Sequence, residues 1–221
     1  FVDGPIRDLH SGTFGGSVKN PVNAIAEMLG KLVDAEGKVQ VPGFYDDVVP
    51  LSELERGSIA SLPFSDDEYK REMGVDQVFG EKGYSTLERR WARPTCDVNG
   101  IWGGYQGEGA KTVLPANAGA KFSFRLVPDQ DPAKIEAGVR AFIKSVTPPG
   151  IKVRLEHHHG AAAVVVPLDS APVKGATRAL AHAYGKQPVY IREGGSIPIC
   201  SSFKKVLGVD SLMLGFGLND D

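Results

Sequence analysis

The segment Lys121-Phe122-Ser123-Phe124-Arg125-Leu126 alternates between polar and apolar side chains without a break. Successive side chains of a β-strand point to opposite faces of a sheet, so this alternation predicts a half-buried strand over about 119–127. Further strands are predicted at 1–10, 95–102 and 153–157. Because the apolar face of a sheet must be covered, the chain also needs a layer of helices.

Two long helices are predicted to supply that layer. Asn20-Pro21 and Asp131-Pro132 each place a capping residue before a proline in the first helical turn. We expect the first helix to end at Gly37 and the second at Pro148-Pro149-Gly150. Strand, helix, two strands, helix and strand in this order predict an antiparallel sheet covered by two helices, an α+β fold. The apolar residues at helical spacing are Ile25, Met28, Leu29 and Leu32 in the first helix and Ile135, Val139, Phe142 and Ile143 in the second.

The stretch from about 38 to 93 interrupts the α+β pattern, because it is polar and broken by prolines. Ser65-x-x-Glu68 and Ser85-x-x-Glu88 have the spacing of capping boxes, in which a serine caps a helix and a glutamate three positions later caps in return. We therefore predict an inserted helical excursion.

A different pattern follows Gly160. Helices are predicted at about 170–184 and 197–207, and strands at 188–192 and 211–216. Alternating helices and buried strands are typical of a parallel α/β sheet, but two strands leave such a sheet open. The sequence therefore predicts two units, residues 1–160 and an incomplete α/β unit over 161–221.

Charge and composition exclude several classes of protein. Lys+Arg 25 against Asp+Glu 27 gives a net charge of -2, which removes the electrostatic case for binding nucleic acid or an anionic membrane. No apolar run reaches the length of a membrane span and no signal peptide is recognised, so we expect a cytoplasmic protein. The two cysteines, Cys96 and Cys200, are too few for a disulfide framework or a metal knuckle.

The segment from Ile191 to Pro198 carries the strongest local signal for a ligand. It joins a predicted strand to a predicted helix at the carboxyl edge of a sheet, where ligands bind in open α/β folds. Gly194 and Gly195 let a ligand approach the backbone, and free amides at a helix start capped by Ser196 favour an anion such as a carboxylate. An ordinary glycine turn with a capping serine explains the same residues equally well.

Other polar residues point less clearly to a site. Arg125 could hold a carboxylate with two parallel hydrogen bonds, or lie in a surface ion pair. His157-His158-His159 cannot all converge on one metal ion from a strand, since neighbouring side chains face opposite sides. His182 is predicted to be structural. No His-x-Asp, His-Glu-x-x-His, Glu-Glu or Cys-x-x-Cys motif occurs, so the sequence contains no self-contained catalytic centre.

Five segments nevertheless follow one another in the order found in one enzyme family. They are Arg7-Asp8-Leu9-His10-Ser11-Gly12-Thr13-Phe14-Gly15-Gly16, Gly109-Ala110-Lys111-Thr112-Val113-Leu114-Pro115, Lys121-Phe122-Ser123-Phe124-Arg125-Leu126-Val127-Pro128, His159-Gly160 and Arg192-Glu193-Gly194-Gly195-Ser196-Ile197-Pro198. Through them the chain resembles the dizinc metallopeptidases of the carnosinase and cytosolic non-specific dipeptidase type.

The resemblance implies a lid or dimerisation domain over residues 1–160 and a returning piece of the catalytic α/β domain over 161–221. It implies two zinc ions in a longer parent protein, with all metal ligands outside this chain. Phe1 and Asp221 would then interrupt that longer chain, and the fragment alone would be inactive.

The resemblance also implies roles for particular residues. His10 would reach across a homodimer to stabilise the oxyanion formed when a zinc-bound hydroxide attacks the substrate, accompanied by Thr112. The substrate would be a small peptide or an N-acyl amino acid. Glu193 would face its amino end, and Arg125, His159, Ser196 and the Gly195 backbone would hold its carboxylate; whether His158 or His159 does so is left open.

Two other readings remain at this point. The chain could be a stand-alone dimerisation or ligand-binding module without catalysis, although the half-built α/β unit argues against a complete protein. A nucleotide-binding protein that uses the Gly194-Gly195 turn is the weaker alternative, because no phosphate-loop spacing accompanies the turn.

Overall fold

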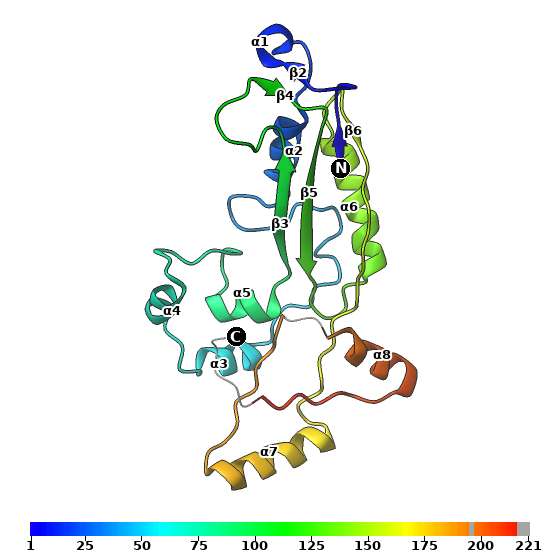
Figure 1. Cartoon of the computed structure of the whole chain (residues 1–221). Helices are drawn as coiled ribbons and strands as arrows, with labels where there is room; N and C mark the ends of the chain where they lie inside the picture. The colour runs from blue at the N-terminus through cyan, green and yellow to red at the C-terminus, as the bar shows by residue number, and fades with distance from the viewer. Residues whose placement is uncertain (195–196, 216–221) are drawn as a thin grey trace.

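The computed structural model describes residues 1–194 and 197–215, and its centre is an antiparallel sheet (Figure 1). The sheet has four strands in the order β3-β5-β1-β6. The antiparallel sheet predicted from the sequence is therefore confirmed. The strands are β1 (Val2–Asp3), β3 (Thr95–Gly103), β5 (Asn117–Arg125) and β6 (Lys152–Val153).

The long strands β3 and β5 form the body of the sheet, and β3 lies at its edge. Their pairing runs from Thr95 opposite Arg125 to Gly103 opposite Ala118, with an irregularity after Val98. Phe122 and Phe124 of β5 pack into the core together with Cys96 of β3. The side chains that alternate with the two phenylalanines, among them Arg125, belong to the opposite face. The alternation in the sequence therefore correctly predicted a one-sided strand.

The two helices predicted from their capping residues, α2 (Pro21–Leu29) and α6 (Pro132–Val146), pack against this apolar face. Asn20 Oδ1 accepts a hydrogen bond from the Val22 amide, and Asp131 Oδ1 accepts one from the Ala133 amide. Both side chains satisfy amides that the first helical turn leaves without partners. The shared core contains Met28, Leu32, Val39, Val41, Phe44, Ile135, Val139, Phe142 and Ile143.

The prediction that the first helix ends at Gly37 was wrong. The helix ends at Leu29, and Leu32 stays buried in the turn that follows. Gly37 instead lies in a tight turn with φ +76°, where a Cβ atom would come within 2.5 Å of the Gly80 backbone. Two signals for glycine, a helix end and a close backbone approach, look the same in sequence.

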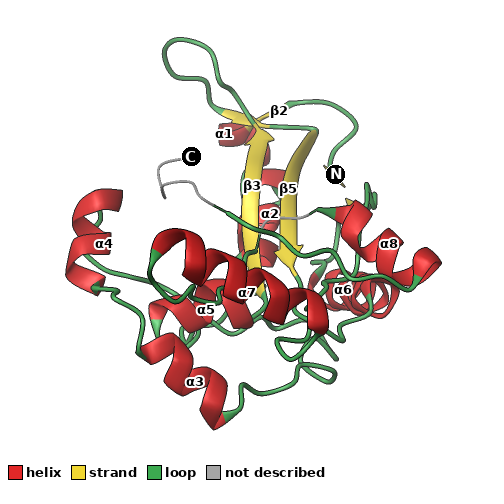
Figure 2. Cartoon of the chain, turned by 90° about the horizontal axis from the view of Figure 1, so that it is seen from below, coloured by secondary structure: helices red, strands yellow, loops and turns green. Residues whose placement is uncertain are grey.

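The predicted excursion contains three short helices (Figure 2), α3 (Glu53–Ala60), α4 (Asp66–Met73) and α5 (Thr86–Ala92). The two predicted helix starts are present: Ser65 Oγ accepts a hydrogen bond from the Glu68 amide, and Ser85 and Glu88 form a complete capping box. A further box, Ser52 with Glu55, begins α3.

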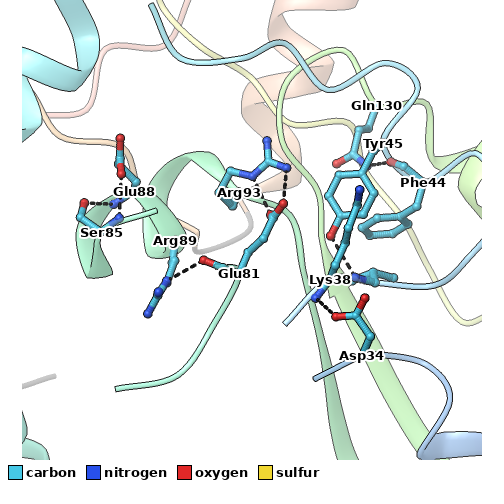
Figure 3. A network of polar contacts seen from close by, with 11 residues as sticks. Asp34, Lys38, Phe44, Tyr45, Glu81, Ser85, Glu88, Arg89, Arg93 and Gln130 are labelled. Carbon is cyan, nitrogen blue, oxygen red and sulfur yellow. Dashed lines mark hydrogen bonds and ion pairs between the residues drawn. The ribbon is translucent and has the colours of Figure 1, made fainter. Parts of the chain in front are cut away.

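A polar network fastens the excursion to the core (Figure 3). Arg93 donates from Nε and Nη2 to the two carboxylate oxygens of Glu81, at 2.7 and 2.8 Å, and both side chains are nearly buried. The same guanidinium lies 4.4 Å from the ring centroid of Tyr84 and 5.3 Å from that of Tyr45. Arg93 thereby joins the end of α5 to the loop before it and to the core.

The helices predicted after Gly160 are present as α7 (Ala171–Tyr184) and α8 (Pro198–Leu207). The parallel strands expected at 188–192 and 211–216 are not: the described residues contain no strand beyond β6, and residue 216 lies outside them. A strand requires a neighbour to take its backbone hydrogen bonds, and the structure offers these segments none. No helix in the described part of the chain combines the length and the apolar character that crossing a membrane requires.

Candidate functional site

A small two-stranded ribbon at one end of the sheet brings His10 and Thr112 together, although 102 positions separate them. The ribbon consists of β2 (Leu9–His10) and β4 (Val113–Leu114), paired antiparallel with His10 opposite Val113. His10 Nε2 lies 3.0 Å from Thr112 Oγ1, and both residues are exposed. The two residues that the resemblance singled out as a pair are neighbours in space.

The backbone around the ribbon sets the chemistry of the imidazole. The Gly12 amide donates to His10 Nδ1 at 3.1 Å, which makes His10 the cap of the short helix α1 (Ser11–Phe14). Because Nδ1 accepts this bond, the ring proton of neutral His10 lies on Nε2. Nε2–H therefore donates to Thr112 Oγ1, and the threonine hydroxyl hydrogen is available to a further acceptor.

Three further hydrogen bonds hold the ribbon in place. The Ser11 amide donates to the Thr112 carbonyl at 3.1 Å, and the Gly4 amide donates to the Ala116 carbonyl at 2.9 Å. Asp8 Oδ1 accepts from the Ala116 amide at 2.9 Å. The sequence analysis gave Asp8 no role of its own, although Asp8 lies in the same segment as His10. A carboxylate two residues before a candidate catalytic side chain is the sequence signal that could have identified it.

Arg125 lies at the other end of the sheet. It is the last residue of β5, which begins near the ribbon and runs away from it for nine residues (Figure 1). At about 3.3 Å per residue, β5 is roughly 25 Å long. The structure therefore does not bring Arg125 to His10 within one chain, and one small ligand cannot touch both.

The histidines after β6 lie in a loop rather than on the predicted strand, because the strand ends at Val153. His157 Nδ1 lies 2.8 Å from Glu136 on α6, and the hydrogen bond from Arg140 and the charges of His157 and Arg140 lower the pKa of the Glu136 carboxyl. His158 and His159 are exposed. Nothing in their positions selects one of them for the proposed site, so that choice stays a prediction.

The glycine turn is described only in part, since Gly195 and Ser196 lie outside the described residues. Glu193 Oε1 accepts a hydrogen bond from the Gly194 amide at 2.9 Å. Arg192 forms an ion pair with Glu55 of α3, and the capping bonds from Ser52 are the main reason why the pKa of the Glu55 carboxyl is lowered. The excursion thus contacts the segment expected to bind substrate.

No metal centre can be assembled from these parts. The described residues contain no group of three or more His, Cys, Asp or Glu side chains that could hold a metal ion. The two cysteines are free, and burial followed by the negative charge of Asp97 raises the pKa of the Cys96 thiol to about 12. Cys96 is therefore a neutral thiol at ordinary pH and is suited to packing rather than to catalysis.

Comparisons with known proteins identify the family of the chain. The peptidase dimerisation domain of the M20 type matches residues 2–151. The Cys-Gly metallodipeptidase DUG1 of Saccharomyces cerevisiae is 38% identical over 225 residues, covering 100% of this chain and 47% of its own length. The human Beta-Ala-His dipeptidase is 31% identical over 218 residues, covering 97% of this chain and 43% of its own length.

Solved structures agree as well. That of the Saccharomyces cerevisiae dipeptidase Dug1p matches with a TM-score of 0.84 and 38% identity, over 100% of this chain and 47% of the other. An M20 family metallo-carboxypeptidase, Sso-CP2 from Sulfolobus solfataricus, matches with a TM-score of 0.81 and 32% identity, over 95% of this chain and 54% of the other. The chain spans about half the length of the curated relatives it matches. With the domain match over residues 2–151, these likenesses establish that the chain belongs to the M20 metallopeptidases and carries their peptidase dimerisation domain.

Proposed function

We propose that the chain is the lid, residues 1–160, and part of the catalytic domain, residues 161–221, of a zinc-dependent dipeptidase or related exopeptidase. The complete protein would hydrolyse peptide or amide bonds of small substrates in the cytoplasm. The observation that carries the proposal is the His10–Thr112 pair, an exposed set of hydrogen-bond donors built on a rigid ribbon. Preformed donors of this kind stabilise an oxyanion without reorganising during the reaction.

His10 and Thr112 would act on the carbonyl oxygen of the scissile bond as negative charge develops there. Nε2–H of His10 and the hydroxyl of Thr112 are both polar hydrogens at the exposed surface of the ribbon. Turned slightly from its 3.0 Å contact with Thr112, the imidazole N–H can share the same acceptor. The ribbon hydrogen bonds keep both groups in place, so little entropy is lost when the substrate binds.

The opposite end of the substrate would be held by the second group of residues. Arg125 would pair with the substrate carboxylate, together with His159, Ser196 and the Gly195 backbone, and Glu193 would face the amino end. The position of Arg125 on the polar face of the sheet, where α2 and α6 do not pack, supports this role. A planar guanidinium there can bind a carboxylate through two hydrogen bonds.

A homodimer would bring His10 of one protomer to the substrate-binding residues of its partner. His10 and Arg125 lie at opposite ends of the sheet, so His10 of one protomer would complete the site of its partner. The edge of the sheet at β3 supports an interface: among the described strands β3 pairs with β5 alone, and its Val98 and Ile101 side chains are exposed. An unpaired edge with apolar side chains favours pairing with a second copy.

The metal would lie in the remainder of the parent protein. M20 relatives named metallodipeptidases support a metal requirement, and we propose two zinc ions. The described residues of this chain do not fit a metal ion, so they would bind and orient the substrate and supply hydrogen bonds, while the bound metal would supply the attacking hydroxide. The chain alone would then be inactive.

The experiment uses the full-length protein encoded by the parent gene, produced with zinc. His10→Ala should lower the turnover of a dipeptide strongly while zinc content measured by mass spectrometry stays the same. His157→Ala, which removes an imidazole that lies beside Glu136 on α6 rather than beside Thr112, is the matched control. Loss of zinc with unchanged turnover per bound metal would refute the role of His10. A metal-free dimer without hydrolase activity would favour the non-catalytic module instead.

Coexpression of two inactive variants tests the contribution across the dimer. Protomers carrying His10→Ala and protomers carrying Arg125→Met should form mixed dimers in which one of the two sites has both residues intact. Random pairing makes half of the dimers mixed, so activity should return to about a quarter of the wild-type level. No recovery in confirmed mixed dimers would mean that both residues serve the same site from one chain.

A further inference from the structure

The loop from Gly103 to Thr112 joins the edge strand β3 to the ribbon, and Tyr105 folds back across it. Gly103 and Gly104 have φ of +142° and +72°, so the chain leaves β3 in a conformation that favours glycine. The Tyr105 hydroxyl donates to the Glu108 carbonyl at 2.8 Å. The Lys111 ammonium lies 5.7 Å from the centroid of the same ring.

The Tyr105 ring occupies space that is free because residue 107 is a glycine. A Cβ atom on Gly107 would lie 2.6 Å from the Tyr105 hydroxyl oxygen and 2.8–3.0 Å from ring carbons. Tyr105 is nevertheless 46% exposed, and it belongs to neither buried core cluster among the described residues. Its contacts close the loop on itself and contribute nothing to the cores of the sheet.

The loop contacts lead directly to Thr112. Lys111, held over the ring, immediately precedes it in the chain, and the Val113 amide donates to the Lys111 carbonyl at 3.0 Å. On the other side the Thr112 carbonyl accepts from Ser11. Thr112 thus lies between the ribbon on one side and the Tyr105 loop on the other.

We propose that Tyr105 is a positioning residue, which closes the 103–112 loop and thereby holds the Thr112 hydroxyl ready for the substrate. The inference rests on the proposed function and adds a residue outside the substrate contacts. Without the ring, the loop gains conformational freedom, and each turnover must fix Thr112 again before its hydrogen bond forms. The loss should appear in kcat more than in KM, since the negative charge is absent from the bound substrate and develops on the way to the tetrahedral intermediate.

The test compares three variants of the full-length protein with one control. Tyr105→Ala removes the ring, Gly107→Ala displaces it, and Tyr105→Phe removes only the hydroxyl. Gly57→Ala in α3 is the matched control, because a Cβ atom there meets nothing within 4 Å. We expect kcat to fall about tenfold for Tyr105→Ala and Gly107→Ala, about threefold for Tyr105→Phe, and not at all for the control.

Two readouts separate positioning from a general loss of structure. Hydrogen exchange of amides 106–112 should become faster in Tyr105→Ala, while exchange in β5 and α6 stays unchanged. In a Thr112→Val background, Tyr105→Ala should cause no further loss of kcat, because its effect passes through Thr112. Independent, multiplying losses would overturn the inference, as would a wild-type kcat in Tyr105→Ala.

The failure of this inference is distinguishable from failure of the proposed function. A wild-type protein that hydrolyses no dipeptide overturns the proposed function and this role with it. An active wild-type protein whose Tyr105 and Gly107 variants behave like Gly57→Ala overturns only the role of Tyr105.

Discussion

At the scale of single residues, His10 and Thr112 lie in surroundings that differ from those of Cys96. His10 and Thr112 are exposed and hydrogen-bonded to each other, which suits donors that must meet a ligand. Cys96 is half-buried on β3 beside Asp97, and both burial and that negative charge oppose the thiolate. A residue's environment, more than its type, decides whether it is available for chemistry.

The pKa of about 12 predicts that Cys96 resists alkylation. At pH 8 roughly one thiol in ten thousand would be ionised in the folded protein, since each pH unit below the pKa lowers the fraction tenfold. Iodoacetamide treatment followed by mass spectrometry should leave Cys96 unmodified in the native chain and modify it fully after denaturation. Equal rates in both states would contradict the buried environment.

The same shift predicts a stability effect with a defined sign. Well below pH 9 the thiol is protonated in both the folded and the unfolded chain, so Cys96 contributes no pH dependence to the free energy of unfolding there. Between pH 9 and about 12 the unfolded thiol ionises first, which favours unfolding. Relative to Cys96→Ala, the wild-type chain should therefore lose stability in this window, as measured by urea denaturation at several pH values.

At the scale of elements, polar contacts link the three short helices of the excursion to each other and to the core. Its helices start at serine caps, and Thr86 of α5 donates to Asp66 of α4 at 2.6 Å. Burial alone would lower the pKa of Arg93, but the hydrogen bonds and charge of Glu81 raise it. The Arg93–Glu81 pair is thus a nearly buried ion pair with two hydrogen bonds, and its loss should destabilise the excursion (Figure 3).

Two neighbouring ion pairs make a matched test of that statement. Arg93→Met leaves the nearly buried Glu81 carboxylate without its partner and should lower the free energy of unfolding by about 3 kcal/mol. Lys82→Met breaks the ion pair with Glu36, whose side chains are 76% and 63% exposed, and should cost less than about 1 kcal/mol. Urea denaturation measures both, and equal losses would show that burial does not govern these pairs.

At the scale of the whole molecule, the two parts of the chain differ in how much they bury. Residues 1–160 contain two core clusters, whereas Val173 is the one buried residue described beyond residue 160. Most of the exposed large apolar side chains belong to residues 165–214. α7 and α8 lie beyond the end of the sheet that is away from the ribbon (Figure 1). An apolar surface of this kind marks an interface.

This difference predicts the order of proteolysis. Limited trypsin digestion of the 221-residue chain should cut first within 161–215, for example at Lys186 or Arg192, and leave an N-terminal fragment that ends no earlier than Lys174, the first tryptic site after Arg154. In the full-length protein the same sites should be protected, if the remaining catalytic domain covers them. First cuts within the excursion, with 161–215 intact, would contradict the proposed division.

The elements that local chemistry specifies could be predicted from the sequence. Capping residues located the starts of α2, α4, α5 and α6, and the alternation at 121–126 located β5 and its buried face. The end of α2 and the role of Gly37 could not be predicted, because a close approach between Gly37 and Gly80 depends on a segment far along the chain. The strands expected near 188–192 and 211–216 are not formed in the described residues, because an apolar pattern does not show whether a neighbouring strand is present to take the backbone hydrogen bonds.

The sequence by itself thus determined the antiparallel sheet, its two covering helices, the helical excursion and the family to which the chain belongs. Only the tertiary structure decided that His10 and Thr112 touch, and that Arg125 lies at the end of the sheet away from them. Periodicity and caps act within a few residues, so a sequence shows them directly. Contacts between residues about 100 positions apart follow from how the elements pack, which no local pattern contains.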